Sequence, residues 1–245
     1  LFFAESLVFG LSVIVPFLLL IFLRSNVNTS KLPNIQICKS TDNDCLKTAI
    51  QKGLLLVPED QVIKVENWTV PAGKKYMKLD QHYTDIKIYN MEQTKILKVS
   101  SEATDTKIVY IIEMFTPLLI FVANFDFNSG TLMGVPFVKK GKVTYIYEGY
   151  ESTTIFVADI HQKGDKKYLT VSNAIQSMRG SGLRSYFITD DREFDAKANQ
   201  IMNDNWEKIE EDVGQGYSDL FADVFKYVAN SVLFDKYSYD ELFLK

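Results

Sequence analysis

The hydrophobic positions of the chain follow three patterns, and the first is a dense apolar run at residues 6–23 that carries no charge. A run of about 18 such residues can span a membrane as a helix or form the core of a secretory signal. Neither pattern is complete, because a basic segment before the run and a small-residue cleavage site are both missing. We predict a cleaved leader within residues 1–30. A retained membrane anchor and a buried core helix stay as alternatives.

The second pattern covers residues 79–188, where β-branched and aromatic runs alternate with separators rich in Gly, Asp and Ser. It predicts strands, and the separators are too short for crossover helices, so the sheet should be antiparallel. In KKYLTVSNAI, Leu169, Val171 and Ile175 should share one side. In IVYIIEMF both sides are apolar, which indicates apolar material on each face. Residues 142–160 could form one long strand or two strands joined at Gly149.

The third pattern is helical, with apolar residues at steps of three and four. A short helix is predicted in STDNDCLKTAIQKG, capped by Asp42 or Asn43 and ended by Gly53; its apolar face would hold Leu46, Ala49 and Ile50. The following residues 54–73 look irregular, because Pro58 and Pro71 act as breakers.

Two C-terminal helices are predicted, with a break at Gly214 and Gly216. The apolar stripe of the first contains Phe194, Ala198, Ile201, Ile209 and Val213. The stripe of the second contains Tyr217, Leu220, Phe221, Val224, Phe225, Val228 and Val232. A helix, many antiparallel strands and then long helices predict an α+β fold.

Composition and charge exclude several classes of protein. With 47% hydrophobic and 13% aromatic residues the chain should have a large core, and is not disordered. A net charge of −4 argues against a general nucleic-acid binder, which needs a basic surface. Two Cys and two His leave little for a metal site. His82 and His161 are expected at the surface, and the acid run at residues 207–212 on a solvated helix face. We predict no catalytic residue, no metal and no cofactor.

Cys38 and Cys45 are the only cysteines. A pair this close, with nothing else to bond, indicates one local disulfide in an oxidising compartment, and two free thiols are the alternative. Acceptor sequons for glycosylation occur at Asn28 and Asn67. Both features favour secretion.

Several segments together resemble the takeout and haemolymph juvenile-hormone-binding proteins of insects. The most specific are FDAKANQIMNDNW (Phe194 to Trp206) and YDELF (Tyr239 to Phe243). The segment LPNIQICKSTDNDCLKTAI (Leu32 to Ile50) resembles the opening of that family, with two Cys around a short loop before a helix. GTLMGVPFVKKGKVTYIYEG (Gly130 to Gly149) resembles its middle strand pair.

This resemblance implies one domain over residues 31–245, an elongated α/β-wrap whose long C-terminal helix lies inside a strongly curved antiparallel sheet around an apolar tunnel. It implies a protein secreted into the haemolymph that carries a small hydrophobic ligand, such as a juvenile-hormone-like terpenoid or a fatty acid. By position, Cys38 and Cys45 correspond to the N-terminal disulfide of the family. We expect a monomer without stable membrane association once the leader is removed, and no nucleic-acid partner.

Ligand binding in such a tunnel would rest on desolvation of apolar groups, with one or two polar anchors. Tyr110, Tyr145 and Tyr147 are candidate anchors. The candidate wall residues are Phe115, Phe121, Trp206, Phe221 and Phe225. Each of these could instead be ordinary core packing. The alternative functions are a membrane-anchored interaction domain that keeps the N-terminal helix, and an enzyme, for which the sequence shows no catalytic pair.

Overall fold

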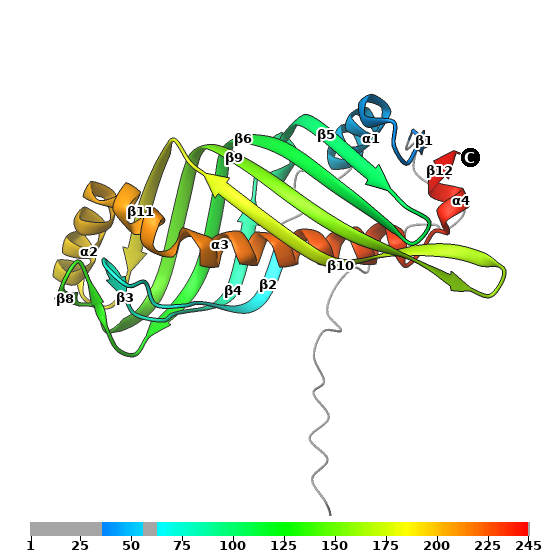
Figure 1. Ribbon diagram of the computed structural model, residues 1–245. Coiled ribbons are helices and arrows are strands. Elements are labelled where there is room, and N and C mark those ends of the chain that lie inside the picture. The colour runs from blue at the N-terminus through cyan, green and yellow to red at the C-terminus, as the bar shows by residue number, and fades with distance from the viewer. Residues whose placement is uncertain (1–35, 56–62, 245) are drawn as a thin grey trace, which may run out of the picture. The chain divides into compact units, whose positions relative to one another are not determined.

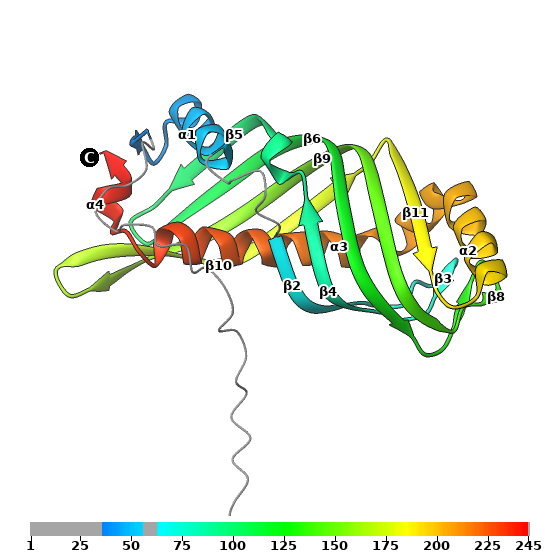
Figure 2. The same cartoon turned by 180° about the vertical axis from the view of Figure 1, so that it is seen from behind.

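The computed structural model describes residues 36–55 and 63–244, which form an α+β fold. The long helix α3 (Trp206–Ala229) runs along the concave side of a curved antiparallel sheet, as Figures 1 and 2 show from opposite sides. This confirms the predicted fold class. The predicted leader at residues 1–30 and the sequon at Asn28 lie outside the described residues.

Within the described ranges, none of the helices combines the length and the apolar character that crossing a membrane requires.

Two long strands form the middle of the sheet. β6 (Lys107–Phe127) and β9 (Lys139–Lys163) pair antiparallel along most of their length. Shorter strands flank each of them: β5 and β4 pair with the two halves of β6, β10 and β11 pair with the two halves of β9, and β2 pairs with β4. These flanking strands are β2 (Ile63–Val70), β4 (Gln81–Tyr89), β5 (Lys95–Ala103), β10 (Lys166–Arg179) and β11 (Gly182–Ile188).

The remaining elements are short or lie outside this sheet. The helical elements are α1 (Asn43–Leu55), η1 (Met91–Gln93), α2 (Arg192–Asp204), the π-helical turn η2 (Asn230–Phe234) and α4 (Tyr239–Leu242). The short strands are β1 (Cys38–Lys39), β3 (Met77–Lys78), β7 (Thr131–Leu132), β8 (Val135–Pro136) and β12 (Phe243–Leu244). β1 pairs parallel with β12, which joins the two ends of the described chain.

In both long strands, the alternation of buried and outward-facing residues shifts by one residue at a single point. Thr116 pairs with Tyr150 and Leu118 with Glu148, so Pro117 stands opposite Gly149. Before Pro117 the buried positions of β6 are even-numbered, and after it they are odd-numbered. Gly149 has φ +55°, which glycine adopts at little cost, and Pro117 has no N–H to donate. The sheet therefore bends here without losing its register.

This bend separates two apolar cores between the sheet and its helices. The α2-side core holds Tyr83, Phe121, Tyr145, Tyr217 and Phe221, among others, and contacts α2 and most of α3. The α1-side core contains, among its buried residues, Leu46, Ile96, Ile108, Tyr110, Ile112 and Leu169. Phe225 of α3 packs against both cores, so the helix connects them.

The structure corrects two strand predictions and decides between the alternatives of a third. Residues 54–73 are not all irregular, because β2 occupies Ile63–Val70. Residues 142–160 belong to one strand that passes through Gly149, which resolves the two alternatives. Ile175 does not share a side with Leu169 and Val171, because its side chain is 54% exposed. A bulge between Val171 and Asn173 inserts one residue, and this reverses the inward and outward positions that follow.

The helix breaks also differ from the predictions. α1 is capped by Asp42, whose carboxylate accepts from the Cys45 backbone N–H at 3.1 Å, but it passes Gly53 and reaches Leu55. The C-terminal helices separate at Asn205, and α3 continues through both Gly214 and Gly216. A Cβ at Gly216 would lie 2.7 Å from Val70 Cγ1, so this glycine allows close contact between α3 and β2.

Candidate functional site

A hydrogen-bonded group of tyrosines lies inside the α2-side core, between the sheet and α3. The Tyr83 hydroxyl lies 3.0 Å from that of Tyr145 and 2.7 Å from that of Tyr217. Gln81 Oε1 accepts from Tyr83 at 3.0 Å and from Tyr217 at 2.7 Å. Burial raises the pKa of Tyr83 and Tyr217 well above the ordinary value, and that of Tyr145 to about 12. All three hydroxyls are therefore neutral at physiological pH.

A cavity of about 20 Å³ adjoins this tyrosine group. Its wall is mostly apolar and aromatic, and consists of Tyr145, Tyr147, Met178, Leu183, Met202, Ile209, Glu210, Val213, Gly214 and Tyr217. A second cavity of similar volume lies between α2 and the β7–β8 hairpin. Each has room for about one water molecule. The first cavity lies at the contact of α2, α3 and the concave face of the sheet.

The prediction of a solvated helix face for the acid run at residues 207–212 is wrong in part. The Asp212 carboxylate accepts hydrogen bonds from four successive backbone N–H groups, those of residues 74–77, at 2.7–3.1 Å. Burial raises the pKa of Asp212, but the N–H groups outweigh this and lower it overall. Glu210 is half-buried in the cavity wall, and burial raises its pKa, although the Gly180 N–H lowers it. Asp212 therefore anchors a loop, and Glu210 is the acidic group of the cavity.

A second polar group lies on the inner face of the sheet, next to the bend. Gln176 Nε2 donates to the Tyr150 hydroxyl at 2.7 Å, and this hydroxyl lies 3.6 Å from the sulfur of Met178. Tyr150 contacts Phe221 of α3 with ring centroids 5.7 Å apart. Met178 also lines the first cavity, so the cavity and this polar group share a side chain.

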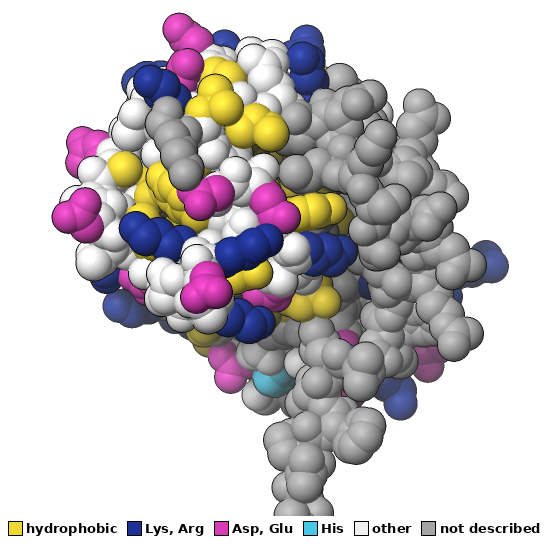
Figure 3. All heavy atoms as spheres, turned by 90° about the vertical axis from the view of Figure 1, so that its right-hand side faces the viewer, with side chains coloured by type: hydrophobic (Ala, Val, Ile, Leu, Met, Phe, Trp, Pro, Cys, Tyr) yellow, Lys and Arg dark blue, Asp and Glu magenta, His cyan; other side chains and the backbone are white. Residues whose placement is uncertain are grey.

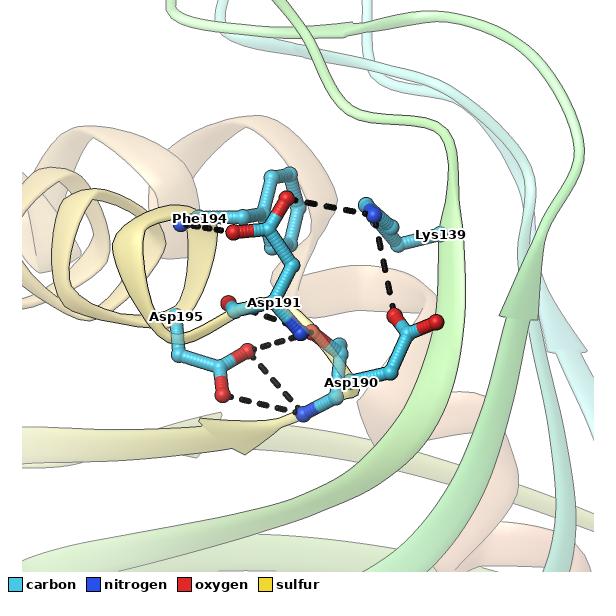
Figure 4. A network of polar contacts seen from close by, with 6 residues as sticks. Lys139, Asp190, Asp191, Phe194 and Asp195 are labelled. Atoms are coloured by element: carbon cyan, nitrogen blue, oxygen red, sulfur yellow. Dashed lines mark hydrogen bonds and ion pairs between the residues drawn. The ribbon is translucent and has the colours of Figure 1, made fainter.

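α2 is fixed at its first turn by a network of carboxylates. Asp191 caps the helix by accepting from the Phe194 backbone N–H at 3.0 Å, and Lys139 Nζ lies 3.3 Å from its carboxylate. Asp195 accepts from both the backbone N–H and the hydroxyl of Thr189 (Figure 4). The lysine also lies over the Phe194 ring, 5.7 Å from its centroid. These contacts join α2 to β9 and to the end of β11.

Two asparagines on α2 bind the free edge of β11. Asn203 Oδ1 accepts from the Ser185 N–H at 2.7 Å, and its Nδ2 donates to the Ser185 carbonyl at 3.3 Å. Asn199 makes the same pair of contacts with Phe187, at 2.6 and 3.4 Å. Two residues four apart on the helix therefore bind two residues two apart on the strand. Both asparagines belong to FDAKANQIMNDNW, so this segment has a clear structural role.

The sequence-predicted site residues fall into three groups. Phe121, Tyr145, Tyr147 and Phe221 are buried in the α2-side core, and Tyr110 is buried in the α1-side core. Phe225 and Trp206 are partly buried at the margins of these cores. Phe115 is only half-buried and alternates with the inward-facing Met114 and Thr116, so it lies on the other face of β6.

Sequence reasoning missed Gln81, Tyr83, Tyr150 and Gln176 as interior residues. A glutamine in a strand suggests an outward position, although Gln81 and Gln176 are 0% and 1% exposed. The bulge in β10 also moves Gln176 inward, where simple alternation would place Ile175. For Gln81 and Tyr83 a signal was present, because they alternate with His82 and Thr84 in QHYT.

The predicted disulfide is present, since Cys38 and Cys45 are bonded. It holds the start of α1 to β1 beside the α1-side core. The other predicted glycosylation site, Asn67, is exposed on β2. On the face shown in Figure 3, basic, acidic and apolar side chains of the described residues are interspersed. That face offers no basic patch of the kind that nucleic-acid binding needs.

Comparison with known proteins points to one family. Among solved structures, Takeout 1 from Epiphyas postvittana is similar in fold, with a TM-score of 0.70. The match covers 86% of this chain and 100% of that chain at 12% identity, so it bears on the fold alone. No curated protein matches the chain by sequence. The family model described as haemolymph juvenile hormone binding protein matches residues 17–244. The chain therefore belongs to the haemolymph juvenile hormone binding protein family.

Proposed function

We propose that this protein is a secreted carrier that binds a small hydrophobic ligand between the concave face of the sheet and α3. The observation that supports this most is the aromatic and apolar cavity enclosed by α2, α3 and the sheet, in a chain whose family is named for hormone binding. Each methylene of a ligand moved there from water would contribute ~0.8 kcal/mol before ordering costs.

Binding requires the interior to open. Pockets for small molecules have volumes of roughly 300–1,000 Å³, much more than the cavity of about 20 Å³. Met178 and Met202 in its wall are unbranched and adapt easily to new contacts. We expect these side chains to move first, and the apolar parts of α2 and α3 to close around the ligand.

The test of the carrier function is native mass spectrometry with lipid extraction of the full-length protein from its source. A delipidated sample is then titrated with a panel of terpenoids and fatty acids. An extracted apolar ligand, or micromolar binding of a panel member, would support the proposal. A protein that carries none and binds none is not a carrier.

One substitution tests the location of the site. Gly214→Leu places a side chain in the cavity wall, where a Cβ would meet only the flexible Glu210 side chain, at 3.2 Å. We expect at least a tenfold loss of affinity with little change in stability. Gly53→Leu is the matched control in α1, where a Cβ would have nothing within 4 Å. Equal affinity in both variants would place the ligand elsewhere.

Secretion is supported by the disulfide and the exposed sequon at Asn67. N-terminal sequencing of the native protein tests it directly. A start near residues 25–31 would support secretion after cleavage of the leader. An intact leader would support the alternative of a membrane-anchored domain.

A further inference from the structure

Three buried polar atoms without a hydrogen-bond partner lie together on the inner face of β9 and β10. They are Ser152 Oγ, Thr154 Oγ1 and Gln176 Oε1. Their residues are 5%, 0% and 1% exposed. The register places Thr154 directly opposite Gln176, and Ser152 lies two residues along β9 on the same face. Buried polar groups in proteins are rarely left unpaired, because each one has lost its water without a replacement.

The amide nitrogen of Gln176 fixes the orientation of its side chain. Its Nε2 donates to Tyr150, so its carbonyl oxygen Oε1 is turned away from that residue and can only accept. Burial raises the pKa of Tyr150, and the nearby Ser152 hydroxyl offsets part of that rise, although the two groups lack the geometry of a hydrogen bond. The group thus presents one fixed acceptor beside two hydroxyls that can each donate or accept.

Several other buried hydroxyls near the sheet have partners. Thr116 of β6 lies 2.8 Å from the hydroxyl of Thr94, and the tyrosines of the α2-side core pair with one another. The Tyr110 hydroxyl and Gln81 Nε2 are also unpaired, but they belong to β6 and β4; three of the five unpaired buried side-chain atoms among the described residues gather on β9 and β10. This group of three lies one inward position beyond Met178, which lines the cavity, and α3 faces it with Phe221 against Tyr150.

We propose that the ligand carries a hydroxyl group that binds here, donating to Gln176 Oε1 and accepting from Thr154 or Ser152. This rests on the proposed carrier function and names the chemical class of its ligand, an apolar alcohol. A hydroxyl supplies both the donor and the acceptor that the group needs. An ether supplies only an acceptor, which leaves the glutamine oxygen unpaired, and a hydrocarbon supplies neither.

The test compares three probes of equal length on the delipidated full chain: 1-tetradecanol, its methyl ether and tetradecane. Each displaces the fluorescent reporter N-phenyl-1-naphthylamine. We expect the alcohol to bind at least tenfold more tightly than the ether, about 1.4 kcal/mol. In Thr154→Val and Gln176→Met, this preference should fall below about twofold while tetradecane binds as before.

Thr116→Val is the matched control, because it makes the same change at a buried threonine that has a partner. It should keep the preference for the alcohol. The two threonine variants should also differ in thermal stability without ligand. Thr116→Val should lower Tm because Thr94 loses its partner, whereas Thr154→Val should leave Tm unchanged or raise it.

The outcomes separate the two proposals. Equal affinity for all three probes would overturn the hydroxyl site and leave the carrier function intact. An ether that binds as tightly as the alcohol would also overturn it. If none of the probes displaces the reporter, the hydroxyl site is wrong, and the lipid extraction and the ligand panel decide the carrier function separately. A fall in Tm for Thr154→Val as large as for Thr116→Val would show that Thr154 is already satisfied within the fold.

Discussion

The two cores bury tyrosine in different ways. On the α2 side, the hydroxyls of Tyr83, Tyr145 and Tyr217 form hydrogen bonds with one another and with Gln81 Oε1, and only Gln81 Nε2 of this group has no partner. On the α1 side, Tyr110 is buried to a similar degree, and its hydroxyl has no hydrogen-bond partner. The first arrangement specifies how β4, β9 and α3 meet, because each strand or helix supplies one hydroxyl. The second holds its elements together through apolar contacts and the disulfide.

This difference suggests that the α2-side core fixes the geometry of the interior more closely than the α1-side core does. A network of buried polar groups is satisfied only in one arrangement, whereas apolar contacts tolerate small shifts. The four predictions below begin with the largest expected effect and end with a direct comparison of the two cores.

The largest effect is expected at the centre of the aromatic cluster. Phe121→Ala removes a fully buried ring that contacts Tyr83, Tyr145 and Tyr217, and should lower the free energy of unfolding by about 3–5 kcal/mol. Ile111→Ala on the same strand is the control, because its side chain is 38% exposed. It should change stability by about 0.5 kcal/mol or less. Urea unfolding measures both, and similar losses would contradict the placement of the core.

The next effect concerns the loop that Asp212 holds against α3. Asp212→Asn should lower the free energy of unfolding by about 1.5–3 kcal/mol, because a charged acceptor of four N–H groups is lost. Glu211→Gln, which removes only an exposed ion pair with Lys75, should cost about 0–1 kcal/mol. Equal effects of the two substitutions would exclude the anchoring role.

Acid provides a second measurement of the same carboxylate. Its pKa in the folded protein is below the unfolded value of 3.8, so its contribution is complete above pH 3.8. That contribution is lost as the pH falls from 3.8 through the lower folded pKa. The unfolding free energy of the wild type should therefore fall more steeply in this window than that of Asp212→Asn. Parallel curves would show that Asp212 does not couple folding to proton binding.

The smallest effect gives the most direct comparison of the two cores. Tyr217→Phe should lower the free energy of unfolding by about 1–2 kcal/mol, because Tyr83 and Gln81 each lose a partner. Tyr110→Phe removes a hydroxyl that has no partner, and should be neutral or slightly stabilising. Unfolding curves recorded under the same conditions compare the two variants. If Tyr110→Phe destabilises as much as Tyr217→Phe, the contrast between the cores is wrong.

The pattern of the sequence was sufficient for the α+β class, and the resemblance added the wrapped sheet, but neither predicted which way every residue faces. Local signals predicted the antiparallel strands, a cap at Asp42 or Asn43 and the apolar stripe on α3. The outward facing of Ile175 could not be predicted, because one inserted residue in β10 reverses the alternation. The hydropathy of the sequence does not reveal such a bulge. The pattern predicted that Gly216 ends a helix, because glycine is a poor helix former. Its actual role is close contact with Val70, about 146 positions earlier in the chain, and a local pattern does not contain such a contact.

The interior polar residues were hidden for the same reason. Gln81, Gln176 and Asp212 have polar side chains. From the pattern of one strand or helix alone, such residues are predicted on the solvent-facing side. Their partners come from other elements: α3 for Gln81, β9 for Gln176 and the loop at residues 74–77 for Asp212. Tertiary contacts of this kind decide between a solvated and a buried polar group, and the pattern of one element does not contain them.

Side-chain amides that bind strand edges also affect how this protein could associate with other molecules. Besides Asn199 and Asn203 on β11, Asn230 binds both backbone groups of Val171 at 2.8 and 3.1 Å, and Gln51 bridges Thr94 and Ile96 beside β5. Each amide imitates the next strand without offering a further one. A β-strand of another molecule would have to displace these side chains before it could add to those positions, so the amides act as built-in inhibitors of intermolecular sheet growth.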